Sequence, residues 1–182
     1  FVVTFHPVTL ESATAEDQLQ ELLLALEGLK DTGLIFTLPN ADTDGRVLIE
    51  MIERFTQRHD NARAYPSLGQ LRYLSCVAEC DGVIGNSSSG IIEVPSLHKA
   101  TINIGDRQRG RLRAASVINC APLREEISGS IAHMYSSKFR DGLATVQNPY
   151  GDGGASARVC SVICSFPLEG ILKKRFFDLV ER

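Results

Sequence analysis

Val83-Ile84-Gly85-Asn86-Ser87-Ser88-Ser89-Gly90 is the stretch that decides the fold of this 182-residue chain. The two β-branched residues predict a buried strand, and the glycine and serines after them predict a turn into a helix that begins near Ser89. A strand that passes through a short polar loop into a helix is typical of a βαβ unit. The stretch is neither a P-loop nor a G-x-G-x-x-G fingerprint, so the ordinary NTPase and dinucleotide motifs are absent.

The rest of the chain alternates between the same two kinds of segment. Short apolar runs predict further strands at residues 1–5, 34–38 and 101–104, with weaker ones at 62–65 and 117–118. Apolar spacing or flanking breakers predict helices around residues 19–26, 48–55, 71–77, 123–134, 155–164 and 168–180. This alternation predicts an α/β fold, a doubly wound parallel sheet of the Rossmann-like kind, in one domain over residues 1–182.

Five of the predicted strands, the weaker one at 62–65 included, are each followed by a polar or glycine-bearing loop. The loops are His6-Pro7, Pro39-Asn40, Pro66-Ser67, the 85–90 stretch and Gly105-Asp106-Arg107-Gln108-Arg109. In an open parallel sheet, ligands bind beyond the carboxyl ends of the strands. Because all five loops lie at that edge, the sequence predicts a binding cleft there.

The loop 85–90 is the strongest candidate for ligand binding. Its free N–H groups, its three hydroxyls and the start of the next helix suit the oxygens of a phosphate. The alternative is a helix N-cap within a serine-rich turn. Glu93, one helical turn on, can accept hydrogen bonds from ribose hydroxyls or simply complement the helix N-terminus. Pro95 should kink or shorten that helix.

Two further features could serve an anionic ligand. Arg107, Arg109, Arg111 and Arg113 form a local cationic patch, which suits bidentate phosphate recognition but also a solvated loop. His6 is the only histidine at the predicted cleft edge and could donate a proton or counter a phosphate charge. A lone histidine after a strand is more often structural, so its candidacy depends on its neighbours.

Composition limits the other classes of function. The net charge of −3 and the pI of about 5.8 argue against a general nucleic-acid or membrane-surface binder. No run of about 18 apolar residues and no signal peptide is visible. The five cysteines are odd in number and lack metal-ligand spacing, so we expect buried, reduced thiols in a cytoplasmic protein without a metal. The apolar start at Phe1, without an initiator Met, indicates a fragment of a longer chain.

The stretch from Gly85 to Ser96 resembles the signature of UDP-N-acetylglucosamine 2-epimerases, and the stretch from Asn103 to Arg111 is similar to a second block of that family. The residues around His6, the Pro39-Asn40 turn and the run from Asn148 to Gly153 agree in order and spacing. The Asn-Ser-Ser-Ser-Gly and Gly-Asp-Arg-Gln forms resemble the hydrolysing branch, which feeds sialic-acid-type sugar synthesis. The non-hydrolysing branch usually carries Asp-Ser-Gly-Gly and Arg-Asp-Thr-Thr-Glu there.

The resemblance implies the second of two Rossmann-like halves, arranged as in GT-B glycosyltransferases, with the active site between them. It implies that Ser87, Ser88, Ser89 and Gly90 form the UDP-phosphate loop and that Glu93 holds the ribose. Asn40 and Arg107 would add nucleotide contacts, Ser67 would lie in the uracil loop, and His6 would assist departure of the diphosphate. No cofactor is implied.

The implied reaction is elimination of UDP to a 2-acetamidoglucal, followed by addition of water to give N-acetylmannosamine. Elimination needs a base at the sugar C2 proton and an acid for the leaving group, and the family's carboxylates for this work come largely from the missing N-terminal half. We therefore expect that half, and a homo-oligomer at full length, as partners. The alternatives are a GT-B glycosyltransferase domain that binds a nucleotide sugar, and a stand-alone nucleotide-binding module.

Overall fold

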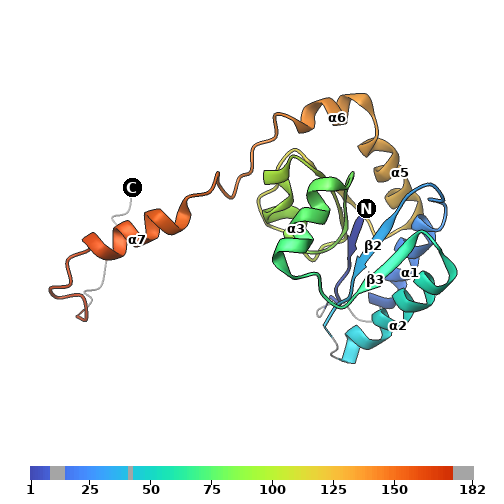
Figure 1. Ribbon diagram of the computed structural model, residues 1–182, viewed down its shortest axis with the longest axis horizontal. Coiled ribbons are helices and arrows are strands. Elements are labelled where there is room, and N and C mark those ends of the chain that lie inside the picture. Colours follow the sequence, from blue (N-terminus) through green and yellow to red (C-terminus); the bar gives the residue numbers. More distant parts are fainter. Residues whose placement is uncertain (9–14, 41–42, 174–182) are drawn as a thin grey trace, which may run out of the picture. The chain divides into compact units, whose positions relative to one another are not determined.

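A computed structural model describes residues 1–8, 15–40 and 43–173 of the chain (Figure 1). Its six strands are β1 (Val2–Thr4), β2 (Leu34–Thr37), β3 (Ala62–Tyr65), β4 (Gly82–Gly85), β5 (Ala100–Ile104) and β6 (Val117–Cys120). All pair in parallel in the order β3-β2-β1-β4-β5-β6. This is the order of a doubly wound Rossmann sheet, and the chain reverses direction across the sheet between β1 and β4. The predicted fold class is confirmed.

Helices cover both faces of the sheet. The helices are α1 (Ala15–Leu26), α2 (Thr43–Arg58), α3 (Gly69–Glu79), α4 (Ser89–Ile92), α5 (Arg124–Met134), α6 (Ser137–Leu143), α7 (Ala155–Ser165) and the 3₁₀ helix η1 (Val94–Leu97). Figure 1 shows α1 and α2 together on one side of the strands and α3 on the other. Alternate side chains of β1 therefore enter different cores, because successive residues of a strand point to opposite faces.

The larger core joins the sheet to α1, α2 and α5. It contains Phe1, Val3 and Phe5 from the start of the chain, together with the buried leucines of α1. The smaller core lies under α3 and η1 and contains Val2, Val77, Val83 and Val94. The strands are apolar along their length because both faces of the sheet are covered.

Most of the predicted elements are present, and three expectations are wrong. Residues 168–173 form turns instead of the start of a helix, with Gly170 at φ 73°, and the remainder of that predicted helix lies outside the described residues. Leu71 of α3 is 81% exposed although its spacing predicted a core position. Cys160 and Cys164 are exposed on α7, whereas the other three cysteines are partly buried. Helix α6 was not predicted.

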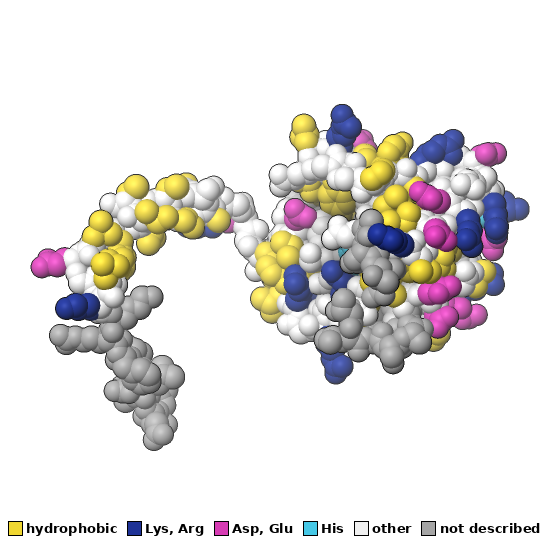
Figure 2. Space-filling model, turned by 90° about the horizontal axis from the view of Figure 1, so that it is seen from below, with side chains coloured by type: hydrophobic (Ala, Val, Ile, Leu, Met, Phe, Trp, Pro, Cys, Tyr) yellow, Lys and Arg dark blue, Asp and Glu magenta, His cyan; other side chains and the backbone are white. Residues whose placement is uncertain are grey.

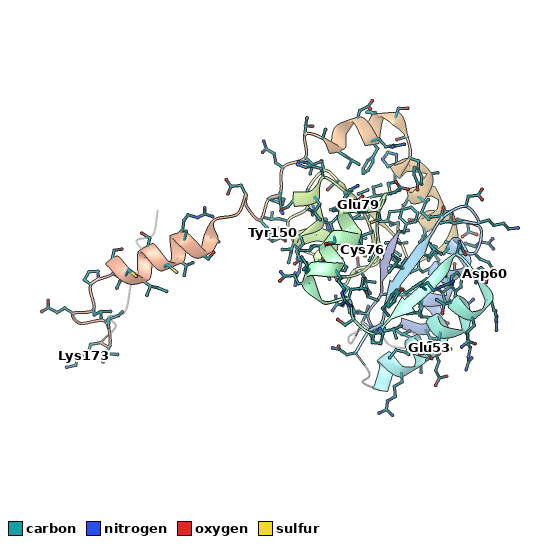
Figure 3. The ribbon with its side chains drawn as sticks, viewed as in Figure 1. Glu53, Asp60, Cys76, Glu79, Tyr150 and Lys173 are labelled. Carbon is teal, nitrogen blue, oxygen red and sulfur yellow. The ribbon has the colours of Figure 1, made fainter. Side chains whose placement is uncertain are left out.

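The chain divides into two compact units, Phe1–Tyr150 and Gly151–Arg182. Tyr150, labelled in Figure 3, is the last residue of the first unit. In the second unit, α7 carries apolar side chains along its length (Figure 2), and Val159, Val162 and Ile163 are each more than half exposed. No helix in the described part of the chain is long and apolar enough to cross a membrane. The assignment of residues 1–182 to one domain stays a prediction.

Candidate functional site

The point where β1 and β4 end is the centre of the candidate site. Thr4 pairs with Gly85 as the last register pair of the two strands. Gly85 has a φ of 140°, and a Cβ there would lie 1.9 Å from the Thr4 carbonyl oxygen. Only glycine lets the main chain turn this close to β1. The two strands therefore deliver His6 and the loop 86–90 to neighbouring positions at the carboxyl edge.

His6 is bonded to the first residue of that loop. The fully buried Asn86 accepts a hydrogen bond from the His6 N–H through Oδ1 at 2.8 Å and donates one from Nδ2 to the His6 carbonyl oxygen at 2.9 Å. The main-chain N–H of Asn86 donates to the Thr4 carbonyl oxygen at 3.2 Å. These bonds fix the His6 main chain beside the loop, and the role of its side chain stays a prediction.

Arg107 comes to the same point from the end of β5. Its Nη1 donates to the Asn86 carbonyl oxygen at 3.1 Å, and Nε2 of the buried Gln108 donates to the same oxygen at 2.8 Å. Partial burial lowers the pKa of Arg107 below its ordinary value, and the nearby Arg111 guanidinium adds to that direction. A guanidinium has five N–H donors, so Arg107 keeps donors for an anion while it holds the loop.

The serines of the loop differ in what they offer to a ligand. Helix α4 is only four residues long and is followed by η1, with Pro95 in its first turn, so the predicted shortening of the helix is confirmed. Ser88 occupies the N-cap position, but its hydroxyl makes no capping bond. Ser87 Oγ accepts a weak bond from the Ser89 N–H at 3.4 Å. The Ser89 hydroxyl is buried, so a ligand would reach this residue only through its main chain.

Gly90 fixes this loop against the sheet. A Cβ at Gly90 would lie 2.6 Å from Cγ2 of Thr101 on β5. The Thr101 hydroxyl donates to the Gly90 carbonyl oxygen at 2.6 Å, with both groups buried. The close approach and the hydrogen bond hold the start of α4 against β5, directly after the Ser87–Ser88 segment.

The remaining predicted residues lie farther from this centre. Glu93 is half-buried at the end of α4. Asn40 is exposed after β2, which neighbours β1, and Ser67 is exposed after β3, the edge strand. Ser67 Oγ accepts a hydrogen bond from the Gly69 N–H at 3.1 Å. The structure therefore brings His6, the serine loop and Arg107 together, and it places Asn40 and Ser67 along the same edge of the sheet.

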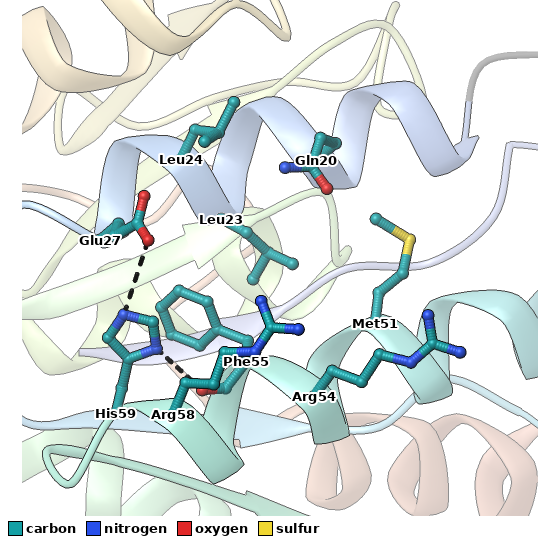
Figure 4. Close-up of a pocket in the computed structure, with 9 residues that line it drawn as sticks. All are labelled: Gln20, Leu23, Leu24, Glu27, Met51, Arg54, Phe55, Arg58 and His59. Atoms are coloured by element: carbon teal, nitrogen blue, oxygen red, sulfur yellow. Dashed lines mark hydrogen bonds and ion pairs between the residues drawn. The ribbon is translucent and has the colours of Figure 1, made fainter.

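Sequence reasoning did not single out Asn86 or Gln108, nor an adjoining polar cavity. The cavity holds about 620 Å³ at the ends of β5 and β6, with Arg109, Arg113 and Asn119 in its lining. The sequence did contain one signal for Asn86, because a side-chain amide directly after a buried strand indicates a polar group at the site. A second cavity of about 210 Å³ lies between α1 and α2 (Figure 4), where His59 stacks on Phe55 and its Nε2 lies 4.0 Å from Glu27.

No group of three or more potential metal ligands occurs among the His, Cys, Asp and Glu residues of the described ranges. At the β1–β4 junction the described residues offer N–H and hydroxyl donors, the Arg107 guanidinium and the His6 imidazole. These groups suit a diphosphate more than a neutral ligand.

Comparisons with known proteins identify the family of this chain. The family model for UDP-N-acetylglucosamine 2-epimerase matches residues 1–164. Polysialic acid biosynthesis protein P7 of Escherichia coli is 40% identical over the whole chain, which spans 46% of that protein. The GDP/UDP-N,N'-diacetylbacillosamine 2-epimerase (hydrolyzing) of Campylobacter jejuni is 34% identical over 98% of the chain, which spans 47% of that protein. The chain thus spans about half the length of these curated relatives.

Two solved structures share the fold. A UDP-GlcNAc 2-epimerase from Neisseria meningitidis bound to UDP-GlcNAc has a TM-score of 0.65 at 16% identity, over 90% of this chain and 43% of that one. The Methanocaldococcus jannaschii enzyme in complex with UDP-GlcNAc and UDP has a TM-score of 0.66 at 16% identity, over 90% and 45%. With the family match and the relatives above, these findings place the chain in the UDP-N-acetylglucosamine 2-epimerase family.

Proposed function

We propose that this chain is the UDP-binding half of a hydrolysing UDP-N-acetylglucosamine 2-epimerase, which converts UDP-N-acetylglucosamine to N-acetylmannosamine and UDP. The observation that carries the proposal is the junction of β1, β4 and β5, where Asn86 links His6, the serine loop and Arg107. The resemblance assigns the UDP phosphates to the serine loop, a nucleotide contact to Arg107 and assistance in departure of the diphosphate to His6. The junction also lies at the reversal point of the sheet, where doubly wound folds bind their ligands.

In the proposed site, this chain holds the leaving group. The Ser87 and Ser88 hydroxyls and the main-chain N–H groups up to Gly90 bind the diphosphate, Arg107 neutralises it, and Glu93 accepts hydrogen bonds from the ribose. Asn40 adds a nucleotide contact, and the Ser67 loop offers main-chain groups to the uracil. His6 assists departure of UDP as its charge develops.

The reaction proceeds in two steps without a cofactor. The C2 proton and the C1–O bond to UDP are lost, which gives 2-acetamidoglucal and UDP. Water then adds across the new double bond, with hydroxyl at C1 and hydrogen at C2, to give N-acetylmannosamine. The base at C2 belongs to the half of the enzyme outside this chain, and that half completes the cleft. We also propose a homo-oligomer at full length and a cytoplasmic location, which suits five unpaired cysteines.

The hydrolysing branch is supported by two observations. The loop reads Asn-Ser-Ser-Ser-Gly, the form that resembles this branch. The relatives from Campylobacter jejuni and Legionella pneumophila both carry "hydrolyzing" in their names, at 34% and 31% identity. Those names specify diacetylbacillosamine nucleotides. The activity assay below therefore uses both UDP-N-acetylglucosamine and UDP-N,N'-diacetylbacillosamine as substrates.

Calorimetry with UDP tests the proposed binding of UDP. We expect the 182-residue chain to bind UDP weakly. Ser88→Ala or Arg107→Ala should weaken binding by about tenfold or more, since a hydrogen bond to a charged group contributes about 1.5–3 kcal/mol. Cys76→Ala on α3 is the control, because Cys76 is partly buried and packs against the smaller core, away from the polar groups of the site. Equal effects of all three substitutions would refute the site assignment.

An assay for released UDP tests the proposed reaction. We expect no turnover of UDP-N-acetylglucosamine or of UDP-N,N'-diacetylbacillosamine by the 182-residue chain, because the base at C2 comes from elsewhere. A longer chain that includes the other half should release UDP together with a free 2-acetamido sugar of inverted configuration at C2. Turnover by the 182 residues alone would contradict the division of the site.

A further inference from the structure

Asn86 lies where β1 and β4 part. Their ladder ends at the Thr4–Gly85 pair, after which the Asn86 N–H still donates to the Thr4 carbonyl oxygen at 3.2 Å. Beyond this point β1 leads toward α1, which packs in the larger core, and β4 leads through α4 to η1, which packs in the smaller core on the other face. The two main chains diverge, so the ladder between them cannot continue.

The Asn86 side chain bridges this gap. Its Oδ1 accepts from the His6 N–H at 2.8 Å, and its Nδ2 donates to the His6 carbonyl oxygen at 2.9 Å. A carboxamide carries the same donor and acceptor as a peptide group. The buried side chain therefore replaces the next rung of the ladder and fixes both main-chain polar groups of His6.

The carbonyl of Asn86 extends this linkage to the next strand. It accepts hydrogen bonds from Gln108 Nε2 at 2.8 Å and from Arg107 Nη1 at 3.1 Å. Gln108 is only 2% exposed, so this bond is made inside the protein. Asn86 thus joins the ends of three strands, and each of them carries a residue of the proposed diphosphate site.

We propose that Asn86 is the positioning residue of this site: it holds His6 and Arg107 at fixed positions relative to Ser87 and Ser88 and acts through them on the diphosphate. The proposal rests on the proposed function. Alanine cannot replace the amide, because it has neither the acceptor for the His6 N–H nor the donor for the His6 carbonyl oxygen.

The test compares Asn86→Ala with Asn61→Ala. Asn61 is the matched control, because its Nδ2 also donates two bonds to main-chain carbonyls, of Leu29 and Thr32 at 2.8 and 2.7 Å, but it precedes β3 at the other edge of the sheet. We expect Asn86→Ala to weaken UDP binding about tenfold or more, a loss that corresponds to at least one hydrogen bond, whereas Asn61→Ala should bind UDP as the wild type does. In proton NMR, UDP should shift the His6 imidazole resonance of the wild type and of Asn61→Ala, and not that of Asn86→Ala at saturating UDP.

A measurement without ligand separates this proposal from the proposed function. The His6 amide proton should exchange slowly with deuterium in the wild type and quickly in Asn86→Ser, whose side chain is too short to span the gap. Failure of the wild type to bind UDP would refute the proposed function. The exchange data would then still show whether Asn86 holds the main chain of His6. A folded Asn86→Ala or, if that does not fold, Asn86→Ser that binds UDP as tightly as the wild type would overturn the positioning role. Unfolding of both variants would also overturn it, because Asn86 would then be a structural residue.

Discussion

At the scale of single residues, the geometry of the site requires two residues without a Cβ atom. Gly85 and Gly90 lie on either side of the serine loop, and a Cβ at either position would overlap β1 or β5, respectively. At Gly85 the obstacle is the main chain of Thr4, which cannot move without loss of the strand pair. At Gly90 it is the side chain of Thr101. Both glycines are therefore fixed by the approach of another strand.

Gly90→Ala should destabilise the protein by about 1–3 kcal/mol, the usual cost of overpacking a close contact. The added methyl group would lie 2.6 Å from Thr101 Cγ2 and displace the start of α4. Urea denaturation measures the change. Gly129→Ala in α5 is the control: a methyl group added there would have nothing within 4 Å, so helix propensity should make this variant as stable as the wild type or more so. An unchanged stability of Gly90→Ala would contradict the close packing.

Tyr135 makes stability depend on pH in the alkaline range. Burial first, and then its hydrogen bond to Asp81 at 2.8 Å, raise the pKa of Tyr135 to about 12, above the ordinary value of 10.0. Because the folded state favours the protonated phenol, this contribution is fully present below pH 10 and is lost as the pH rises toward 12. Urea denaturation from pH 9 to 12 should show a smaller decline for Tyr135→Phe than for the wild type. The same decline in both proteins would exclude this linkage.

At the scale of elements, helices with similar apolar spacing differ in burial. Helix α1 packs against α2 and α5, and its leucines at 19, 22, 23 and 26 are all buried. Helix α3 covers the opposite face, and only Val77 among its residues is buried. The difference arises because α1 has neighbours on both sides and α3 meets mainly η1 and the sheet.

Leu22→Ala should therefore lower the free energy of unfolding by about 2–5 kcal/mol, as expected for a large residue removed from a core. Leu71→Ala in α3 should change it by less than about 0.5 kcal/mol, because this side chain is 81% exposed. Chemical denaturation of the two variants compares them directly. A large loss at Leu71 would show that another element covers α3 in solution.

At the scale of the whole molecule, the second unit exposes an apolar helix face. Val159, Val162 and Ile163 lie on one face of α7, Phe166 directly follows the helix, and all four are more than half exposed in the described structure. A contiguous apolar face of this kind promotes association between chains in water. The first unit, by contrast, encloses its core between helices on both faces of the sheet.

Sedimentation of the 182-residue chain should accordingly show self-association that increases with concentration. The double substitution Val162→Glu and Ile163→Lys should reduce it, because each charge interrupts the apolar face. Ser161→Glu is the control, since residue 161 lies on the opposite side of α7 by helical geometry. Equal self-association of the double variant and the wild type would assign the association to another surface.

The sequence by itself determined the alternation of strands and helices, the parallel sheet and the loops that follow its strands, because hydrophobic period and turn residues act locally. It indicated His6, the serine loop and Arg107 as neighbours, since the carboxyl ends of parallel strands share one edge. Only the tertiary structure decided that Asn86 and Gln108 link these loops, because their bonds join residues up to 80 positions apart. Likewise, it decided which amphipathic faces are covered: local spacing makes a face apolar, but only the packing of distant segments buries it, as it does for α1 and not for Leu71 of α3.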